Sequence, residues 1–364
     1  MSEARPVAVT GLSIMTALGR GASAQLSGTP AFVEVTRFDT SNRRTRHAAI
    51  APDAGTLEEE LDQAIAAACA QSGVDSKTTP LLLALHTPSG RDFGQLRTYT
   101  SACVSASTAL ADAATLIRHG RLDRLVVAAA YLVEPHQYAL FDAGRALSTD
   151  GAVRPFSLNR TGTLLGDGVA AVVLQAGEGL AELVGWSRAG DAHHPVQPAP
   201  DGRGLSTAIA GALHKAHLAP SDIGYVNANA TGTPLADTAE AAALTHTFGG
   251  FPHALVGSPP GIRWVNPQRD GFTHQTGAGG GVAVSSTKGV HGHALEASGL
   301  VEFVVTVQAL REGKLPVNAG YLAADPACAV DVILDAPRPA TSPYGISVNS
   351  AFGGANTALV VRVG

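Results

Sequence analysis

Short runs of β-branched, leucine and alanine residues alternate along the chain with longer segments in which apolar residues recur every three or four positions. The short runs are typical of buried strands, and the longer segments are typical of helices with one apolar face. One such helix follows Cys103, and another covers residues 300–310. Strands alternating with helices predict a layered α/β fold with its strands buried between helices. The predicted strands are residues 7–9, 81–85, 125–129, 169–174, 181–184, 223–227, 282–285, 346–348 and 359–363.

The order of segments repeats once along the chain. Each half opens with a strand and a glycine, carries a Ser/Thr-rich strand that enters an alanine-rich helix, and closes on a Val/Ala/Leu strand, at 168–174 and again at 357–363. A glycine-rich break near residue 177 separates the two patterns. We therefore predict an internal duplication, with an N-terminal half at 1–177 and a C-terminal half at 178–364. Long loops are predicted at 192–204 and 249–281, which are rich in Pro and Gly.

Charged residues make up only 15% of the 364 residues, and hydrophobic residues make up 45%. An average soluble protein has roughly a quarter of its residues charged, so much of this chain is expected to be buried. The net charge of −5 arises without a long single-sign run, which disfavours nucleic acid and membrane surfaces as partners. No apolar stretch approaches the roughly 18 residues of a membrane span, and the polar start does not resemble a cleaved signal. We expect a cytoplasmic protein.

The three cysteines, Cys69, Cys103 and Cys328, are odd in number and far apart, which fits neither a disulfide framework nor a CxxC metal site. Cys103 lies between a β-like approach and a long helix of small residues. That junction predicts a sulfur near a helix N-terminus, where the dipole and the unpaired N–H groups favour thiolate over thiol. Cys103 is therefore a candidate nucleophile. The alternative is a buried structural cysteine, which is also the simplest interpretation of the other two.

Three further polar clusters lie at strand ends. Segment 226–237 ends a strand in amides and hydroxyls, segment 285–293 carries a lysine and a histidine five residues later, and segment 349–356 is a tight glycine turn. Backbone N–H groups in such a turn can point at an oxygen. Together with the segment around Cys103, these clusters resemble the β-ketoacyl synthase family of the thiolase superfamily. The resemblance extends along nearly the whole chain through Val9-Thr10-Gly11-Leu12, Arg154-Pro155-Phe156 and Gly166-Asp167-Gly168.

The resemblance implies a five-layered αβαβα fold built from two related halves, usually as a dimer. It implies that Cys103 attacks the thioester of an acyl carrier protein, and that the N–H groups of Cys103 and Phe352 form the oxyanion hole. Phe352 also matches the family's pocket gate, and His293 matches its second active-site histidine. Lys288 and Glu240 match a supporting ion pair; outside the resemblance they are an ordinary surface lysine and helix glutamate. The implied substrate-binding residues are Thr231, Thr233, Gly353 and Gly354.

Neither a metal nor an organic cofactor is expected. His291 and His293 alternate as metal ligands can, but no third ligand stands at a recognisable spacing. The His193-His194 pair is expected to lie in a solvated loop. No GxGxxG or GxxxxGK[ST] motif is present to hold a nucleotide. The family receives its acyl group on the phosphopantetheine arm of acyl carrier protein.

Asn229 stands where the family's first active-site histidine follows the Val-Asn-Ala strand. In decarboxylative condensation two imidazole donors usually hold the malonyl thioester oxygen while carbon dioxide leaves. Asparagine still offers an NH2 group, although it is shorter and cannot become cationic. Thiolases have an asparagine at a comparable point, and chain-initiating ketosynthases combine cysteine, histidine and asparagine in another order. Members of modular assembly lines that lack the histidine resemble transacylases. Condensation is thus weakened rather than excluded.

Two other departures concern the pocket. Only residues 88–97 separate the strand at 81–85 from the segment that leads into Cys103. The family has a longer excursion there, which builds the subunit interface and the acyl tunnel. Dimer geometry and pocket depth therefore stay open, and segment 249–281 is a candidate replacement for part of the missing wall. Ser350 and Ala351 replace a bulkier aromatic residue and a glycine, which predicts a gate that moves less or opens differently.

Three functions fit these observations. The first is an enzyme that loads an acyl chain from acyl carrier protein onto Cys103 and condenses it with a malonyl unit in polyketide or fatty-acyl assembly. The second is an acyltransferase that passes the chain to another carrier, a hydroxyl or an amine. The third is a chain-length-type partner subunit of a heterodimeric ketosynthase. Retention of Cys103 argues against the third, and Asn229 argues against the first. We predict a ketosynthase-like homodimer or heterodimer, with condensation favoured narrowly over transfer.

Overall fold

The computed structural model describes residues 5–86, 91–249 and 281–364. Most of its strands form a twelve-stranded sheet in the order β13-β11-β10-β15-β16-β9-β1-β8-β7-β5-β6, with β2 paired to β1. The two ends of the sheet come from different halves of the chain. They are joined where β1 and β9 pair antiparallel, with Ala8 opposite Glu182 and Val9 opposite Ala181.

The same strand order occurs in both halves of this sheet. Numbered along its own half, the series β1, β5, β6, β7, β8 has the spatial order 1-5-4-2-3, and so has the series β9, β10, β11, β15, β16. In both series the second strand pairs parallel with the third and fourth, and the fifth is antiparallel to the fourth. The topology thus repeats as the segment pattern does. A division into domains at residue 177 stays a prediction, because both series belong to one hydrogen-bonded sheet.

Every strand predicted from the hydrophobic pattern is present, and most extend beyond the predicted ends. Central strands such as β7 are buried on both faces, so their ends are not marked by alternating polar residues. The bounds in the sheet are β1 Val7–Thr16, β2 Gly19–Arg20, β5 Leu81–Leu85, β6 Arg97–Tyr99, β7 Arg124–Tyr131, β8 Gly168–Ala176, β9 Ala181–Gly190, β10 Ile223–Asn227, β11 Ala283–Ser285, β13 Asp331–Val332, β15 Tyr344–Ala351 and β16 Ala355–Arg362. Two small sheets pair β3 Phe32–Glu34 with β4 His47–Ala49, and β12 Lys314–Leu315 with β14 Arg338–Pro339.

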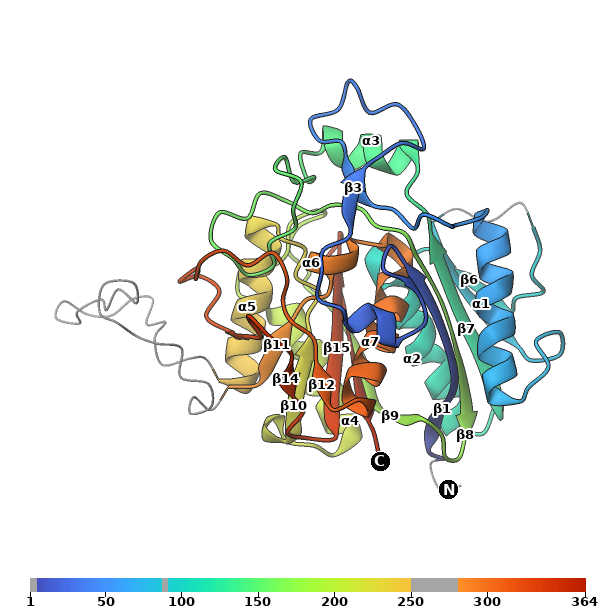
Figure 1. Ribbon diagram of the computed structural model, residues 1–364. Helices are drawn as coiled ribbons and strands as arrows, with labels where there is room; N and C mark the ends of the chain where they lie inside the picture. The colour runs from blue at the N-terminus through green and yellow to red at the C-terminus, as the bar shows by residue number, and fades with distance from the viewer. Residues whose placement is uncertain (1–4, 87–90, 250–280) are drawn as a thin grey trace.

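Helices and sheet form five layers, which confirms the αβαβα expectation (Figure 1). Helices α2 and α7 lie between the two halves of the sheet, α1 covers the outer face of the first half, and α4 and α5 cover that of the second. The helix bounds are α1 Leu57–Ser72, α2 Ser105–Arg118, α3 Pro135–Ala143, α4 Arg203–Ala216, α5 Pro234–Phe248, α6 Lys288–His291 and α7 Ser298–Arg311.

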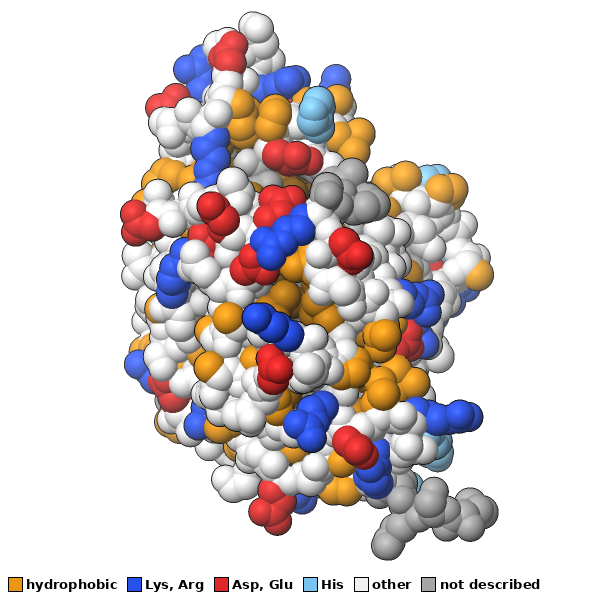
Figure 2. Space-filling view, turned by 90° about the vertical axis from the view of Figure 1, so that its right-hand side faces the viewer, with side chains coloured by type: hydrophobic (Ala, Val, Ile, Leu, Met, Phe, Trp, Pro, Cys, Tyr) orange, Lys and Arg blue, Asp and Glu red, His pale blue; other side chains and the backbone are white. Residues whose placement is uncertain are grey.

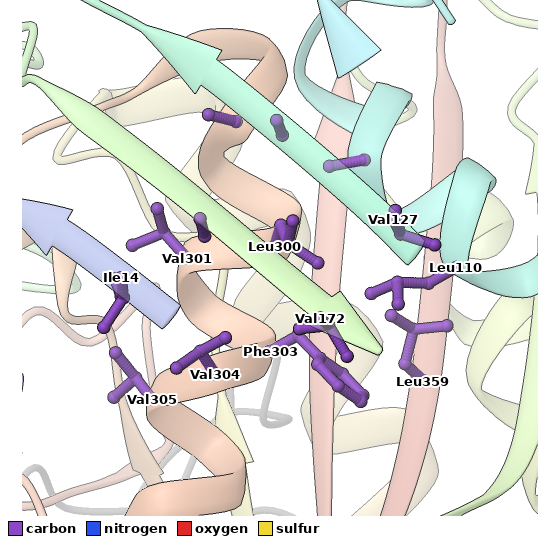
Figure 3. Packing of buried hydrophobic residues seen from close by; sticks show 14 of the residues in the cluster. Ile14, Leu110, Val127, Val172, Leu300, Val301, Phe303, Val304, Val305 and Leu359 are labelled. Carbon is purple, nitrogen blue, oxygen red and sulfur yellow. The ribbon is translucent and has the colours of Figure 1, made fainter. Parts of the chain in front are cut away.

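Helix α7 is buried almost all round, and not along a single stripe as its apolar spacing predicts. Leu300, Val301 and Val304 pack with side chains of the first half of the sheet, including Ile14 and Val172 (Figure 3). A helix enclosed by layers on both sides has to be buried on every face. Three of its polar side chains are therefore inside the protein. They are Ser298, Glu302 and Thr306, which follow one another at four-residue spacing, whereas Gln308 and Arg311 near the C-terminal end are not buried.

The outer face on the α1 side carries acidic and basic side chains interspersed with one another (Figure 2). This agrees with the near balance of charges in the sequence. Among the described residues, no helix is both long and apolar enough to cross a bilayer.

Gly11 lies at the register shift of β1, directly beneath α1. A Cβ atom at this position would stand 2.0 Å from the carbonyl oxygen of Ala68 in α1. Because helix and strand would have to separate, Gly11→Ala is expected to lower the free energy of unfolding by about 1–3 kcal/mol. Urea unfolding measures this. Gly190→Ala is the matched control, since no atom lies within 4 Å of its Cβ position; equal losses in both variants would contradict the explanation.

Candidate active site

Cys103 lies in the short 3-10 turn η2 (Ala102–Val104), between strand β6 and helix α2. The residue before it, Ala102, has a left-handed φ of 51°. The turn packs against β15 of the other half, and only 7% of Cys103 is exposed. The predicted position of the sulfur at the N-terminal end of a central helix is therefore present.

The sulfur contacts a histidine from the second half of the chain. Cys103 Sγ lies 3.0 Å from His293 Nε2, and His293 Nδ1 lies 2.8 Å from Ser298 Oγ. Both partners of the histidine are fully buried or nearly so. For the thiol to donate to Nε2, the ring proton must be on Nδ1, where the Ser298 hydroxyl oxygen can accept it. In this tautomer His293 is placed to remove the proton of Cys103.

The two groups are both uncharged at rest. Burial, followed by the nearby Glu296 carboxylate, raises the pKa of Cys103 to about 12. Burial, followed by the Lys288 ammonium, lowers the pKa of His293 well below its ordinary value. The expected resting thiolate is therefore wrong. Burial destabilises the thiolate more than the helix N-terminus stabilises it. The thiol proton must therefore be removed before or while the sulfur acts as a nucleophile.

Lys288 pairs with Glu302 of α7, and both side chains are fully buried. The predicted pair between Lys288 and Glu240 is wrong, because Glu302 occupies the position beside the ammonium. Glu240, on the outer helix α5, instead accepts a hydrogen bond from the N–H of Asn229 at 2.7 Å. Burial, with Asp237 second, raises the pKa of Glu240 to about 8. A buried charge needs a partner, and α7 supplies one from inside the core. Asn349 Nδ2 also donates to Glu302.

Asn229 lies just beyond the end of β10, and its Oδ1 is 3.3 Å from Lys288 Nζ. An ammonium can only donate, so this contact fixes the amide with its oxygen toward Lys288 and leaves Nδ2 as the donor. A small cavity adjoins Asn229 and Glu240, and Asp191, Ser350 and Asn356 also line it. The structure thus brings Asn229 into the same buried cluster as Lys288 and Glu240.

Thr231 and Thr233 lie on the half-buried loop between β10 and α5. Their hydroxyl oxygens are 3.0 Å apart. The buried carboxylate of Asp237 shapes this loop, because it accepts the N–H groups of Thr231 at 3.0 Å and Gly232 at 3.1 Å. Burial raises the pKa of Asp237 to about 6. The loop is therefore held from inside, while contact of the two threonines with substrate stays a prediction.

The glycine turn between β15 and β16 carries Phe352, whose side chain is 54% exposed. Its ring lies 6.1 Å from the ring of Phe141 in α3. Gly353 and Gly354 have left-handed φ values of 85° and 73°, which favour glycine. Gly354 also accepts the N–H of Asp191 at 2.8 Å. The glycine turn follows β15, the strand that packs against the Cys103 turn η2. The roles of Phe352 as a gate and of its N–H group in an oxyanion hole stay predictions.

Ser350 Oγ lies 2.6 Å from Asn356 Oδ1 across the β15–β16 hairpin, so this substituted position ties the two strands together. Residues 250–280, the candidate replacement for the tunnel wall, lie outside the described residues, as do 87–90 in the short connection before the nucleophile strand.

The ring nitrogens of both neighbouring histidines are engaged in hydrogen bonds. His291 contacts the carbonyl of Gly292 at 2.9 Å and Thr287 Oγ1 at 3.0 Å, while His293 contacts Cys103 and Ser298. Across 5–86, 91–249 and 281–364, no group of three or more His, Cys, Asp or Glu side chains is placed to hold a metal ion.

Sequence analysis missed Ser298 and Glu302, which hold His293 and Lys288. Both had a signal that could have been used. They are polar residues four positions apart in a mostly apolar helix, and such spacing places them on one face. Glu302 could therefore have been proposed as a buried polar residue of this helix. Its pairing with Lys288 could not, because no rule of sequence spacing connects the two residues.

The five layers, the repeated strand order and a cysteine on a central helix define a thiolase-like fold. A family model described as "Beta-ketoacyl synthase, N-terminal domain" matches residues 94–178, and one described as "Beta-ketoacyl synthase, C-terminal domain" matches 180–261 and 269–321. Together these matches cover more than half of the chain. The chain belongs to the β-ketoacyl synthase family.

Two curated relatives are named 3-oxoacyl-[acyl-carrier-protein] synthase 2. The one from Staphylococcus aureus is 29% identical over 275 residues, covering 72% of this chain and 62% of the relative. The one from Synechocystis sp. is 32% identical over 276 residues, covering 72% and 60%. The chain thus matches less than two thirds of the length of these relatives.

Solved structures agree on the fold. A β-ketoacyl synthase from Burkholderia phymatum STM815 superposes with a TM-score of 0.83 at 24% identity, covering 99% of this chain and 100% of that one. A type II polyketide ketosynthase in complex with its acyl carrier protein and a hexaketide has a TM-score of 0.82 at 19% identity, with coverage of 99% of this chain and 100% of that one.

The uncharged Cys103–His293 pair predicts how thiol reactivity depends on pH. Because the pKa of Cys103 is raised to about 12, its thiolate fraction should rise about tenfold per unit from about pH 6 to about pH 9. Alkylation by iodoacetamide, followed by mass spectrometry of the Cys103 peptide, measures this. A plateau in rate across neutral pH would instead indicate a resting thiolate–imidazolium pair. Cys103→Ala identifies any background signal from the other two cysteines.

Proposed function

We propose that this protein is a condensing enzyme of the β-ketoacyl synthase type. It takes an acyl chain from acyl carrier protein onto Cys103 and joins it to a malonyl unit in polyketide or fatty-acyl assembly. The observation that carries the proposal is the 3.0 Å contact between Cys103 Sγ and His293 Nε2 at the centre of the fold. A nucleophile within reach of an uncharged base that a third group orients is the arrangement that covalent catalysis needs.

In the loading step His293 Nε2 takes the thiol proton while the sulfur attacks the thioester carbonyl. A new carbon–sulfur bond forms to Cys103, the bond to the carrier thiol breaks, and the proton leaves with that thiol. The carrier is thereby released with a free thiol, and the acyl group stays on the enzyme. Because the thiol is protonated at rest, this transfer of a proton is part of the loading barrier.

In the condensation step the malonyl thioester oxygen needs hydrogen-bond donors while the carbon–carboxylate bond breaks. His293 can supply one from Nε2 if its ring proton is there, and the Ser298 hydroxyl can support that tautomer by donating to Nδ1 instead of accepting. Asn229 Nδ2 supplies the other. Carbon dioxide leaves, the resulting enolate attacks the acyl carbonyl, and the sulfur of Cys103 is the leaving group.

A second candidate is an acyltransferase that hands the chain to another carrier, a hydroxyl or an amine. Asn229 favours it, because transfer needs Cys103 and His293 but no second donor for an enolate. The third role, a chain-length-type partner subunit, is disfavoured by the retained thiol with a base 3.0 Å away.

The proposed partners are acyl carrier protein and a second ketosynthase-like subunit, either a copy of this chain or a different one. Other proteins of similar fold form such complexes: one is a ketosynthase with its acyl carrier protein, and another is a ketosynthase with its chain length factor. The proposal needs no metal or organic cofactor, since the carrier's phosphopantetheine arm delivers the substrate. We propose a cytoplasmic location.

Acyl loading is tested by intact-protein mass spectrometry after incubation with acyl carrier protein thioesters of short and long chains. The wild type should gain the mass of the acyl group, and Cys103→Ala should not, because the bond forms at that sulfur. A wild-type protein that stays unlabelled with every donor would make the partner-subunit role the better explanation. The thermal midpoint of Cys103→Ala, measured alongside, shows that the variant is folded.

Condensation is tested by carbon dioxide release from malonyl acyl carrier protein after loading. The wild type should release it, and Asn229→Ala should do so about a hundredfold more slowly if Nδ2 holds the developing oxyanion. Asn229→His is the comparison, since it restores an imidazole donor. Release by the histidine variant alone would identify the wild type as a transferase.

A further inference from the structure

A second polar cluster lies next to Cys103, on the side of the first half of the sheet. Strands β5 and β7 run parallel, so their carboxyl ends lie at the same edge. Alternation along β5 places His86 on the face of Ala84, and alternation along β7 places Tyr131 on the face of Ala129. Both alanines belong to the central core around α2 and α7. His86, one residue past the end of β5, and Tyr131, the last residue of β7, therefore lie together at the carboxyl ends of these strands, where ligands of open α/β sheets usually bind.

Glu296 completes this cluster from the second half of the chain. It lies in the 3-10 turn η4 (Leu295–Ala297), which precedes α7 as the Cys103 turn precedes α2. The two turns pack against each other, and η4 also packs against β5 and β7. Glu296 thus comes from the element that matches the Cys103 turn in the repeated topology, and its Oε1 lies 2.9 Å from His86 Nδ1.

Two polar atoms of this cluster are buried without a hydrogen-bond partner among the described residues: Glu296 Oε2 and the hydroxyl of Tyr131. The side chains are exposed by only 4% and 2%. Among the described residues, the Tyr131 hydroxyl has neither an acceptor for its hydrogen nor a donor to its oxygen. Leaving such atoms unsatisfied is unfavourable, and native structures do so chiefly where a ligand or a water completes the bonding.

Glu296 Oε2 and the Tyr131 hydroxyl need different hydrogen-bond partners. Glu296 Oε2 is an acceptor and the Tyr131 hydroxyl is a free donor, and they do not bond to each other. A hydroxyl group satisfies both at once, because it donates one hydrogen and accepts another through its oxygen. An ammonium would satisfy Glu296 but has no lone pair for Tyr131. An alkyl chain would satisfy neither. The packing of the Glu296 turn η4 against the Cys103 turn η2 places the site close to the nucleophile.

We propose that Glu296 and Tyr131 bind a hydroxyl group on the acyl chain that Cys103 carries, and so select hydroxylated acyl thioesters over saturated ones. The proposal rests on acyl loading of Cys103 and specifies its substrate class. His86 acts as a positioning residue, because its bond to Oε1 directs Oε2 toward the chain. A buried water between the two atoms is the other possible occupant, and it would give no selectivity.

The test compares loading of Cys103 from hexanoyl thioesters that are unsubstituted or carry one hydroxyl, moved one carbon at a time along the chain. For at least one hydroxyl position, kcat/KM of the full-length protein should exceed that of hexanoyl by about tenfold. Glu296→Gln and Tyr131→Phe should each reduce this ratio toward one. A ratio is used because the loss of the Glu296 charge also changes the reactivity of Cys103 toward every donor. Equal ratios in the wild type and both variants would overturn the proposal.

Tyr138→Phe is the matched control. It removes a buried tyrosine hydroxyl that already bonds the carbonyls of Thr45 and His47 and contacts neither Glu296 nor Tyr131 through a hydrogen bond, so it should leave the ratio unchanged. If Glu296→Gln fails to fold, Tyr131→Phe decides the question alone, since it keeps the ring and removes only the unpaired atom. A loss of selectivity in Tyr138→Phe as large as in Tyr131→Phe would show a general packing effect and contradict the assignment.

A second arm does not depend on acyl transfer. Alkylation of Cys103 is compared for chloroacetamides with hexyl tails and with hydroxyhexyl tails of varied hydroxyl position. The hydroxylated reagents should react faster in the wild type, and this preference should fall in Tyr131→Phe. If no thioester loads but the alkylation preference is present, the proposed function fails and the hydroxyl site stands. If alkylation shows no preference, the hydroxyl site fails whatever the loading result.

Discussion

The site depends on one contact: the first turns of α2 and α7 meet between the two halves of the sheet. That contact brings Cys103 from the first half to 3.0 Å from His293 of the second. Neither half could form the pair alone, so the duplicated topology is what makes the chemistry available. The same meeting of turns brings Glu296 beside the sulfur. Nucleophile, base and neighbouring carboxylate are therefore positioned by helix packing, and not by a mobile loop.

Burial at this contact determines how the groups are charged. The thiol and the imidazole are buried, which disfavours their charged forms, so the pKa of the first is raised and that of the second is lowered. Lys288 lies in the same interior and forms an ion pair with Glu302, which is also fully buried. Removing either member would leave a buried charge unpaired, which typically costs about 3–5 kcal/mol. The ion pair is thus a condition for placing Asn229, whose oxygen faces the ammonium.

Much of this could be predicted from the sequence, because it is local. Strand positions follow from apolar runs, and Cys103 and His293 stand within short motifs whose neighbours are adjacent in the chain. The partner of Lys288 could not be predicted in this way, since Glu302 reaches it through the packing of α7 and Glu240 is drawn instead to the Asn229 backbone. The predicted protonation state of Cys103 was wrong for a related reason: a helix N-terminus is visible in the sequence, whereas the burial of Cys103 is a property of the assembled layers.

An asparagine at position 229 and an imidazole at the same place would differ little in charge. An imidazole next to Lys288 would also have its pKa lowered, as His291 and His293 do. It would then act as an uncharged N–H donor, and an amide is an uncharged N–H donor too. What changes is reach: the asparagine side chain is shorter, and Lys288 fixes its orientation by holding Oδ1. In the proposed function, the choice between condensation and transfer therefore depends on where Nδ2 lies relative to the thioester oxygen, and not on whether a charge is present.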